Sequence, residues 1–400
     1  MKVALFQVKS YEGVEEKIRE GIEAMGGISQ FAKKGDKVLL KPNLLGFYRP
    51  ERGITTHPSI VKAVARIVRE CGATPIIADS PGMGISYTQC SLKKLYEVCG
   101  ITMIEEAVLN YDTRTSKLGH FEIIRPVIDC NLIINIPKLK THALTVLTGA
   151  VKNLYGLIPG LSKLSYHLTH RDTESFSRLL FELLEVIEKP QLAIVDGIIG
   201  MDGDGPMDGN LRNVGVIIIS DTPILADLIA LKIVGIPCSL LPGHKKRQDL
   251  LKSAELFGDP LSRLILKEPF ILPKSIPSCE WLSFLKPLLT ATPVIRKDCN
   301  GCGTCVNVCL QGAIRLEQGR ASIEDRLCIR CYCCQESCPN QAIALKRSIL
   351  YRFILRITKT RYYRIFEKIY HLTRFPINPF WGKVEDFKGR LWERLRCLRR

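Results

Sequence analysis

A run of four cysteines that occurs twice limits what this chain can fold into more than any other feature of its sequence. The first run comprises Cys299, Cys302, Cys305 and Cys309. The second comprises Cys328, Cys331, Cys334 and Cys338, each 29 positions after its counterpart, so that both runs read C-x2-C-x2-C-x3-C. The same offset carries Ala313–Ile314 onto Ala342–Ile343. A repeated cysteine spacing followed by a repeated apolar pair predicts two similar halves that pack face to face.

This spacing resembles that of the bacterial ferredoxins that carry two [4Fe–4S] clusters, in which the fourth cysteine of each run ligates the other cluster. The resemblance covers about residues 294–345 and implies two ligand sets. One set is Cys299, Cys302, Cys305 and Cys338, and the other is Cys328, Cys331, Cys334 and Cys309. Cys333 breaks the spacing and is a surplus thiol. Two structural zinc sites are the alternative, but a repeated spacing of this kind is a poor match for paired zinc ligands.

The other cysteines stand singly, as Cys71, Cys99 and Cys238 do. A secreted disulfide scaffold is short and spreads its cysteines through the fold, which does not fit this chain of 400 residues. We therefore expect reduced thiols and a cytoplasmic protein. The opening MKVALFQVKS has an apolar run too short for a signal peptide and predicts a first strand. No window of about 18 residues lacks both charge and proline, so we expect no transmembrane helix.

Ahead of the cysteine runs, short apolar runs alternate with helical patterns. The expected strands are Val3–Val8, Lys37–Lys41, Thr74–Ala78, Leu132–Ile136, Leu192–Val195 and Val214–Ile219. The expected helices are Val14–Ala32, Pro58–Cys71, Leu92–Val98, Glu174–Glu188 and Ile224–Val234. This alternation predicts an α/β domain over residues 1–270, with a mostly parallel, buried sheet and flanking helices. Ligands of such a domain bind in loops beyond the carboxyl ends of the strands.

Three further segments are expected after the α/β domain. Residues 271–293 read as a proline-rich linker, residues 294–346 as a small α+β domain that resembles the two-cluster ferredoxins, and residues 347–400 as a basic amphipathic tail with a helical pattern. The net charge of the chain is +17, and +12 of it lies in residues 346–400, where 16 Lys and Arg outnumber 4 Asp and Glu.

A basic tail of this kind suits an anionic membrane surface or an acidic partner. The alternative is a helix that covers the α/β domain and exposes a solvated basic face. Nucleic-acid binding is not expected, because no RNA-binding motif accompanies the charge.

The stretch NIPKLKTHALTVLTGAVKNLYG, residues 135–156, is the most informative part of the α/β domain. It follows a buried strand and places Lys138, Lys140 and His142 in one expected loop, and Lys152 and Asn153 follow in an otherwise apolar segment. A lysine in such a segment is costly to bury unless it is paired or used. The five residues predict a cationic pocket for a carboxylate or phosphate, with His142 or a lysine as acid or base. The alternative is a lysine whose charged end reaches solvent from the edge of a helix.

Other polar stretches follow expected strands. KPN, residues 41–43, ends one strand. In GITTHPS, residues 53–59, an N-cap at Thr56 with His57 on the surface is favoured over an anion site. VDGIIGMDGDGPMDGN, residues 195–210, reads as a loop made of ordinary turns or as a flap that closes over a substrate. Cation binding by its aspartates is less favoured, because the spacing of a calcium loop is missing.

Taken as a set, KPN, TTHP, DSPG, PKLKTH, TGAVKNLYG and DGIIGMDGDGP resemble the domain-of-unknown-function 362 family. The resemblance covers about residues 37–235. That family is often fused to a two-cluster ferredoxin, and the resemblance implies an iron–sulfur protein of anaerobic or redox metabolism. It names no reaction.

Two functions are therefore open. The first is a redox enzyme that passes electrons from two [4Fe–4S] clusters to a small anionic substrate, which Lys138, Lys140, His142, Lys152 and Asn153 would bind or protonate. The second is a non-enzymatic ferredoxin-type carrier or assembly factor, which docks a redox partner protein through the large domain. In either case the tail would allow a cytoplasmic protein to sit peripherally on an anionic membrane surface.

Overall fold

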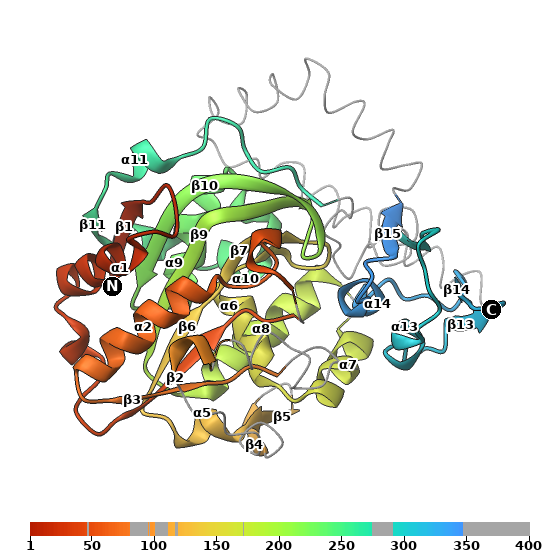
Figure 1. The fold of residues 1–400 in the computed structure, drawn as a ribbon, viewed down its shortest axis with the longest axis horizontal. Coiled ribbons are helices and arrows are strands. Elements are labelled where there is room, and N and C mark those ends of the chain that lie inside the picture. Colours follow the sequence, from red (N-terminus) through yellow and green to blue (C-terminus); the bar gives the residue numbers. More distant parts are fainter. Residues whose placement is uncertain are drawn as a thin grey trace, which may run out of the picture. The chain divides into compact units, whose positions relative to one another are not determined.

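The apolar runs of the first 258 residues build one nine-stranded sheet in the computed structural model (Figure 1). Its strands are β1 (Lys2–Gln7), β2 (Lys37–Pro42), β3 (Thr74–Ile77), β6 (Leu132–Ile136), β7 (Lys138–His142), β8 (Val146–Thr148), β9 (Gln191–Asp204), β10 (Asp208–Ser220) and β11 (Glu255–Gly258). The order is β11-β1-β10-β9-β6-β2-β3, and β7 joins β9 to β8. Five pairings are parallel and three, β1–β10, β9–β10 and β7–β8, are antiparallel. The predicted α/β fold with a mostly parallel sheet is confirmed.

The structure describes residues 1–45, 48–80, 95, 97–100, 111–116, 119–170, 172–273 and 291–346. The expected basic tail over residues 347–400 lies outside these residues. So do most of the expected linker and most of the helix expected over Leu92–Val98.

Helices cover both faces of the sheet. On one face lie α1 (Val14–Ala24) and α2 (Pro58–Glu70), and on the other lie α5 (Arg125–Asp129), α8 (Thr173–Ile187) and α9 (Pro223–Val234). The shorter helices are α6 (Ala150–Asn153), α7 (Gly160–Thr169), α10 (Pro242–Lys245) and α11 (Leu261–Leu264). Strand side chains alternate between the two faces: Leu40 packs under α1 and α2, whereas Leu39 packs under α8.

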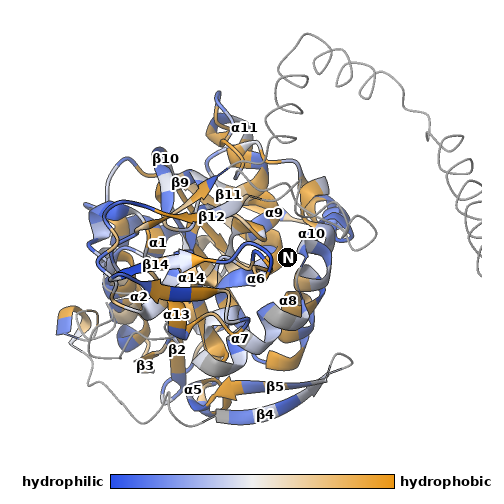
Figure 2. Cartoon of the chain, turned by 90° about the vertical axis from the view of Figure 1, so that its right-hand side faces the viewer, coloured by the Kyte–Doolittle hydropathy of each residue, from blue (hydrophilic) through white to orange (hydrophobic). Residues whose placement is uncertain are grey.

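A small hairpin and a cysteine-rich module complete the described chain. Strands β4 (Tyr111–Ser116) and β5 (Gly119–Ile124) pair only with each other among the described strands. The cysteine-rich module, residues 291–346, contains β12 (Thr292–Ile295), α13 (Thr304–Asn307), β13 (Ile314–Glu317), β14 (Arg320–Ile323), α14 (Cys333–Ser337) and β15 (Ile343–Lys346). Figure 2 shows this module facing the viewer, in front of the α/β domain.

The predicted repeat is visible in the module. Helices α13 and α14 begin 29 residues apart, and so do strands β13 and β15. Both halves contribute to one apolar cluster, in which Val308 and Ile314 pack with Ala342 and Ile343. The two halves therefore pack against each other, as the repeated apolar pair predicts.

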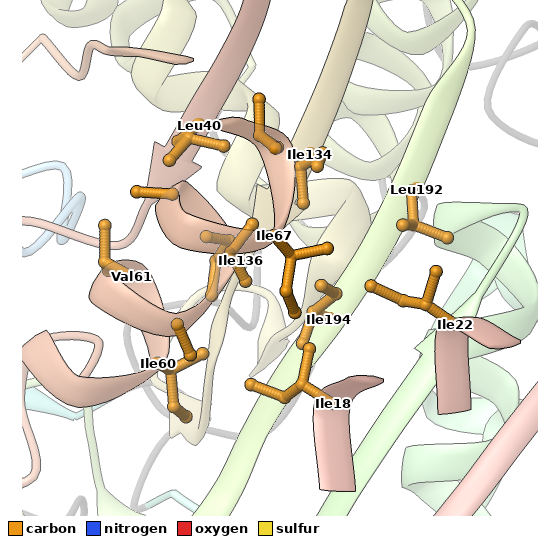
Figure 3. Packing of buried hydrophobic residues seen from close by; sticks show 14 of the residues in the cluster. Ile18, Ile22, Leu40, Ile60, Val61, Ile67, Ile134, Ile136, Leu192 and Ile194 are labelled. Atoms are coloured by element: carbon orange, nitrogen blue, oxygen red, sulfur yellow. The ribbon is translucent and has the colours of Figure 1, made fainter. Parts of the chain in front are cut away.

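The core between the sheet and the first two helices is made of aliphatic side chains. Figure 3 shows Ile18 and Ile22 of α1 and Ile60 and Ile67 of α2 over the strand residues that they cover. The strand residues that it labels are Leu40, Ile134, Ile136, Leu192 and Ile194. Burial on both faces explains why the strands read as continuous apolar runs in the sequence.

Local chemistry sets where the helices begin and end, and the structure corrects two predictions, the N-cap of α2 and the last residue of α1. His57, not Thr56, caps α2, because its Nδ1 accepts from the Ser59 N–H at 3.3 Å. The Thr56 hydroxyl instead donates to the Ile136 carbonyl at 2.6 Å. Helix α1 ends at Ala24 rather than Ala32, since Gly26 and the next residue adopt positive φ, which a helix cannot continue through.

The prediction of a loop over residues 195–210 is wrong, because most of these residues belong to β9 and β10. β9 and β10 form a long antiparallel hairpin in which Asp204 pairs with Asp208. Two of the glycines allow close contact: a Cβ on Gly205, in the turn of the hairpin, would overlap the backbone of Thr141 in β7, and one on Gly209 would overlap the backbone of Asp202. Asp202 is buried and paired with Arg212 at 2.6 Å, so this aspartate is structural.

Candidate functional site

The carboxyl ends of β2 and β3 lie side by side, because the two strands are parallel neighbours. Lys41 near the end of β2 and Asp79 just beyond β3 form a buried ion pair, with Nζ and Oδ1 3.0 Å apart. The Lys41 ammonium also donates to the Pro42 carbonyl at 2.7 Å. Burial lowers the pKa of Lys41 and raises that of Asp79, and the pairing opposes both shifts.

Three asparagines link α6 to these strand ends. The Asn153 amide donates to Asn135 Oδ1 at 2.8 Å and to the Lys41 carbonyl at 3.0 Å. The Asn43 amide donates in turn to Asn153 Oδ1 at 3.1 Å. A fully buried amide network of this kind fixes its members in one geometry. Asn153 is thereby held at the edge of the sheet.

Asp227 of α9 holds the start of α6. Its carboxylate accepts from the backbone N–H groups of Ala150 at 2.5 Å and Val151 at 3.0 Å, and it lies 3.1 Å from His244 Nε2. Gly149 must be glycine, because a Cβ there would overlap the Asp227 carboxylate. A carboxylate at free N–H groups satisfies donors that the helix leaves unpaired. The position of Lys152 on α6 therefore depends on Asp227.

These elements surround a cavity of about 100 Å³ at the carboxyl edge of the sheet. Its wall contains the three lysines Lys41, Lys152 and Lys163, and we call it the lysine cavity. Its acidic lining residues are Asp79 and Glu336. Glu336 belongs to α14, so one wall of the cavity comes from the cysteine-rich module.

The lysines differ in their partners. Lys163 donates to the Ser80 carbonyl, and burial lowers its pKa to about 7 although Asp79 opposes the shift. Lys152 is half-buried and has no hydrogen bond or ion pair with another described residue. Burial lowers its pKa as well, and Glu336 opposes that shift. Lys152 is thus the lysine that can offer its charge to a ligand in the cavity.

His142 connects β7 to the cysteine-rich module. Its Nδ1 accepts from the backbone N–H groups of Leu144 at 3.1 Å and Thr145 at 3.3 Å. The proton of the neutral ring must then be on Nε2, which lies 2.8 Å from Oε1 of Glu336. Burial lowers the His142 pKa to about 4. Burial would raise the Glu336 pKa, but His142 and Lys152 outweigh it and hold that pKa at about 2.

The sequence predicts one loop for Lys138, Lys140 and His142. This prediction is wrong, because all three residues lie on strand β7. Lys138 is paired with Asp196 at 2.9 Å and donates to the Tyr11 hydroxyl at 2.7 Å. Lys140 is fully buried and donates to the Ile54 carbonyl at 2.5 Å. None of these three side chains lines the lysine cavity, whereas the other two residues predicted for the pocket, Lys152 and Asn153, do.

Sequence reasoning missed several residues of the lysine cavity. Asp79 lies two residues after the end of β3, so the rule that ligands bind beyond parallel strand ends could have found it. Lys163 and Glu336 carry no such signal. Lys163 lies on a helix remote from the strand ends in sequence, and Glu336 lies in the cysteine-rich module.

The cysteines of the module line two separate cavities. One is lined by Cys299, Cys302, Cys305 and Cys338. The other is lined by Cys309, Cys328, Cys331 and Cys334, together with Cys333. Each cavity thus combines three cysteines of one run with the fourth cysteine of the other, the division that the resemblance to two-cluster ferredoxins implies.

Each cysteine set brings together four thiols, the ligand number of both a [4Fe–4S] cluster and a structural zinc site. In the described part of the chain, no group of three or more His, Cys, Asp or Glu side chains is arranged to hold one metal ion. A zinc ion draws its sulfurs to about 2.3 Å from one centre, whereas a cluster of four irons keeps its thiolates farther apart. Gly301 and Gly303 adopt positive φ between the cysteines of the first run, so the loop turns tightly there. The [4Fe–4S] assignment stays a prediction.

The fold and the site define an α/β protein with a buried, lysine-lined cavity at the carboxyl edge of its sheet and a cysteine-rich module as one wall. The family model described as "Domain of unknown function (DUF362)" matches residues 38–232. The thylakoid-associated protein sll1697 of Synechocystis sp. is 35% identical over 268 residues, which are 65% of this chain and 83% of that protein. The chain therefore belongs to the DUF362 family.

Two solved structures are similar at 13% sequence identity. A protein from Thermotoga maritima matches with a TM-score of 0.34 over 62% of this chain and 61% of its own. The lactate racemase apoprotein from Thermoanaerobacterium thermosaccharolyticum matches with a TM-score of 0.36 over 58% of this chain and 57% of its own. The chain thus spans about three fifths of each of these structures. Among the helices of the described residues, none has the length and apolar content needed to span a bilayer.

Proposed function

We propose that this protein is an iron–sulfur redox enzyme whose lysine cavity binds a small anionic substrate. In this proposal the two cysteine sets of the module hold two [4Fe–4S] clusters, which when bound would supply single electrons. The observation that carries the proposal is the place of the cavity. A helix of the cysteine-rich module, α14, forms one wall of the lysine cavity and also carries Cys334, a proposed cluster ligand.

The residues of the cavity suit an anion that gains a proton. Lys152 forms no direct ion pair with a described residue, although Glu336 lies in the same lining, so it can pair with a carboxylate or phosphate of the substrate. Lys163, with a pKa of about 7, can donate a proton near neutral pH. The ion pair between Lys41 and Asp79 and the asparagine network keep the floor of the cavity rigid. A rigid, partly desolvated cationic site also stabilises negative charge that develops on the substrate.

The test uses anaerobically purified full-length protein. Iron and sulfide are measured first, with EPR of the dithionite-reduced form, and about eight irons per chain are expected. The reduced protein, freed of dithionite, is then mixed with a panel of small carboxylate and oxyanion acceptors, and reoxidation is followed by absorbance. Lys152→Ala should slow reoxidation by an active acceptor at least about tenfold. Lys62→Ala, a change on the exposed side of α2, should not.

Zinc in place of iron would refute the proposal. So would equal reoxidation rates in the wild type and Lys152→Ala with every acceptor.

A second candidate is a non-enzymatic carrier or assembly factor at a membrane surface. Two observations favour it: the relative from Synechocystis is named as thylakoid-associated, and +12 of the net charge lies in residues 346–400. This candidate predicts that the full chain co-sediments with vesicles that contain an anionic lipid and that binding weakens steeply with salt. A chain that ends at Lys346 should stay in the supernatant. It also predicts that Lys152→Ala leaves electron transfer unchanged.

A further inference from the structure

The two cysteine-lined cavities have different neighbours. The cavity lined by Cys309, Cys328, Cys331 and Cys334, which we call the inner cysteine cavity, shares His167 and Cys333 with the lysine cavity. The cavity lined by Cys299, Cys302, Cys305 and Cys338, the outer cysteine cavity, shares no described residue with it. Figure 1 agrees, since α14 lies beside the α/β domain and α13 lies beyond it. A ligand in the lysine cavity would therefore touch the wall of one cysteine set only.

Cys333 is the first shared residue. It opens α14, directly after Tyr332, which is held in the left-handed region at φ 65° and hydrogen-bonded to the Ala291 carbonyl at 3.0 Å. The repeat places Thr304 at the matching position of the first run, where it lines the outer cysteine cavity. The thiol that is surplus to the ligand pattern is thus located where the second run meets the lysine cavity.

His167 of α7 is the second shared residue. Its ring stacks on Phe176 at 4.8 Å and meets Tyr155 edge-on at 5.7 Å, so its orientation is set by packing. The side chain is buried to more than nine tenths, and its Nδ1 has no hydrogen-bond partner among the described residues. Burial lowers its pKa to about 4, which keeps the ring neutral at neutral pH.

Two more buried polar atoms of the lysine cavity are also without a hydrogen-bond partner among the described residues. They are the Asn43 Oδ1 and Thr148 Oγ1 atoms. A buried polar atom without a hydrogen bond costs about 1–3 kcal/mol, and such atoms in native proteins are usually satisfied by a ligand or by ordered water. Three such atoms around one cavity indicate a ligand with several polar contacts.

We propose that an anion held by Lys152 in the lysine cavity also contacts His167 and Cys333, and that through these two side chains the inner cysteine set responds to the ligand while the outer set does not. This inference rests on the proposed function, because it requires both clusters to be bound. It assigns His167 and Cys333 as residues that contact the ligand. It also makes the inner and outer cysteine sets unequal in their response to that ligand.

The test uses the full chain with its clusters and two probe anions, acetate and inorganic phosphate. Calorimetry measures the Kd of each anion, and EPR of the reduced protein records its effect on the two signals. Saturating anion should shift one signal and leave the other unchanged. The shifted signal should be the one that Cys334→Ser alters, and Cys305→Ser should alter the other. If one of these two serine variants fails to load its cluster, the EPR signal that is missing shows which signal belongs to that cysteine set.

Variants then test the two shared residues. His167→Phe keeps the aromatic packing, and Cys333→Thr copies the first run. Each should reduce or abolish the anion-induced shift, whereas Cys238→Ser, a change at a residue that lines none of the three cavities, should keep it. The inference is overturned if a bound anion shifts both signals, neither, or only the outer one, or if both variants keep the full shift.

Failure of the proposed function gives different results. A wild type without iron, or one that binds neither anion, refutes the proposed function and this inference together. Bound clusters and a bound anion without a selective shift refute this inference alone.

Discussion

Five buried or half-buried lysines lie in or near the candidate site, and the partner of each decides what it can do. Lys41 is neutralised by Asp79, and Lys138 is neutralised by Asp196. Lys140 is left with a backbone carbonyl, and burial lowers its pKa well below the usual value. Only Lys152 and Lys163 of these five lysines both border the lysine cavity and stand outside a direct ion pair with a described residue. The chemistry of the site therefore depends on these two.

The first prediction concerns the charge of Lys163. Because its pKa is about 7, the ammonium is charged below that pH and neutral above it. Anion binding should therefore weaken as the pH rises from 6 to 8.5, by about tenfold, equivalent to ~1.4 kcal/mol. Calorimetric titrations with acetate across this range measure the effect. In Lys163→Met the dependence should flatten, whereas Lys62→Ala should keep it. Binding that strengthens with rising pH would contradict this assignment.

The second prediction concerns the ion pair between Lys41 and Asp79. Asp79→Ala leaves a buried ammonium without its carboxylate, which should lower the free energy of unfolding by about 3–5 kcal/mol. Replacing both partners with apolar residues, as in Lys41→Met with Asp79→Leu, should restore much of the loss. Urea unfolding of the wild type, both single variants and the double variant measures the coupling. A double variant as unstable as the sum of the two single variants would show that the pair is not coupled.

At the scale of elements, α6 is the helix that brings Lys152 and Asn153 to the lining of the lysine cavity. It has only four residues, too few to be stable by itself. Its position comes from contacts at both ends: Asp227 accepts from its first N–H groups, and Asn153 is held by the asparagine network. The apolar residues around Lys152 in the sequence reflect this burial of α6 against α8 and α9.

The third prediction therefore removes the contact at the start of α6. Asp227→Ala leaves two buried N–H groups unsatisfied, and the free energy of unfolding should fall by about 2–4 kcal/mol. Acetate binding should weaken as well, because Lys152 loses its fixed position. Urea unfolding and calorimetry measure the two effects. Asp249→Ala, which breaks an exposed pair with Lys252, is the matched control and should change neither. A stability loss with unchanged binding would mean that α6 does not position Lys152.

At the scale of the whole molecule, the sequence predicts what depends on local pattern and misses what depends on contacts between distant segments. Strands β1, β2, β3 and β6 lie within a residue of their expected bounds, since buried parallel strands are continuous apolar runs. Strand β7 was expected as a loop, because two of its five residues are lysines whose charges are satisfied by residues far away in the sequence.

In the candidate site, too, the residues marked by local pattern could be predicted, and those placed by contacts between distant segments could not. Lys152 and Asn153 could be singled out, because a polar pair interrupts an apolar run. Glu336 could not be connected with His142 from the sequence, since 194 residues separate them and nothing local marks the contact. That contact, together with an ion pair between Arg296 and Asp208, joins the cysteine-rich module to the α/β domain.

The last prediction follows from this joint construction. The apolar core of the module includes Cys305, Cys334 and Cys338, so bound clusters would contribute folding energy to it. Removing the iron should therefore loosen α14, one wall of the lysine cavity, and weaken acetate binding at least about tenfold. Calorimetry before removal, after removal and after anaerobic reconstitution measures this, with far-UV circular dichroism to show that the α/β domain stays folded. An affinity that survives complete loss of iron would mean that the α/β domain forms the binding site alone, and that α14 covers the cavity without shaping it.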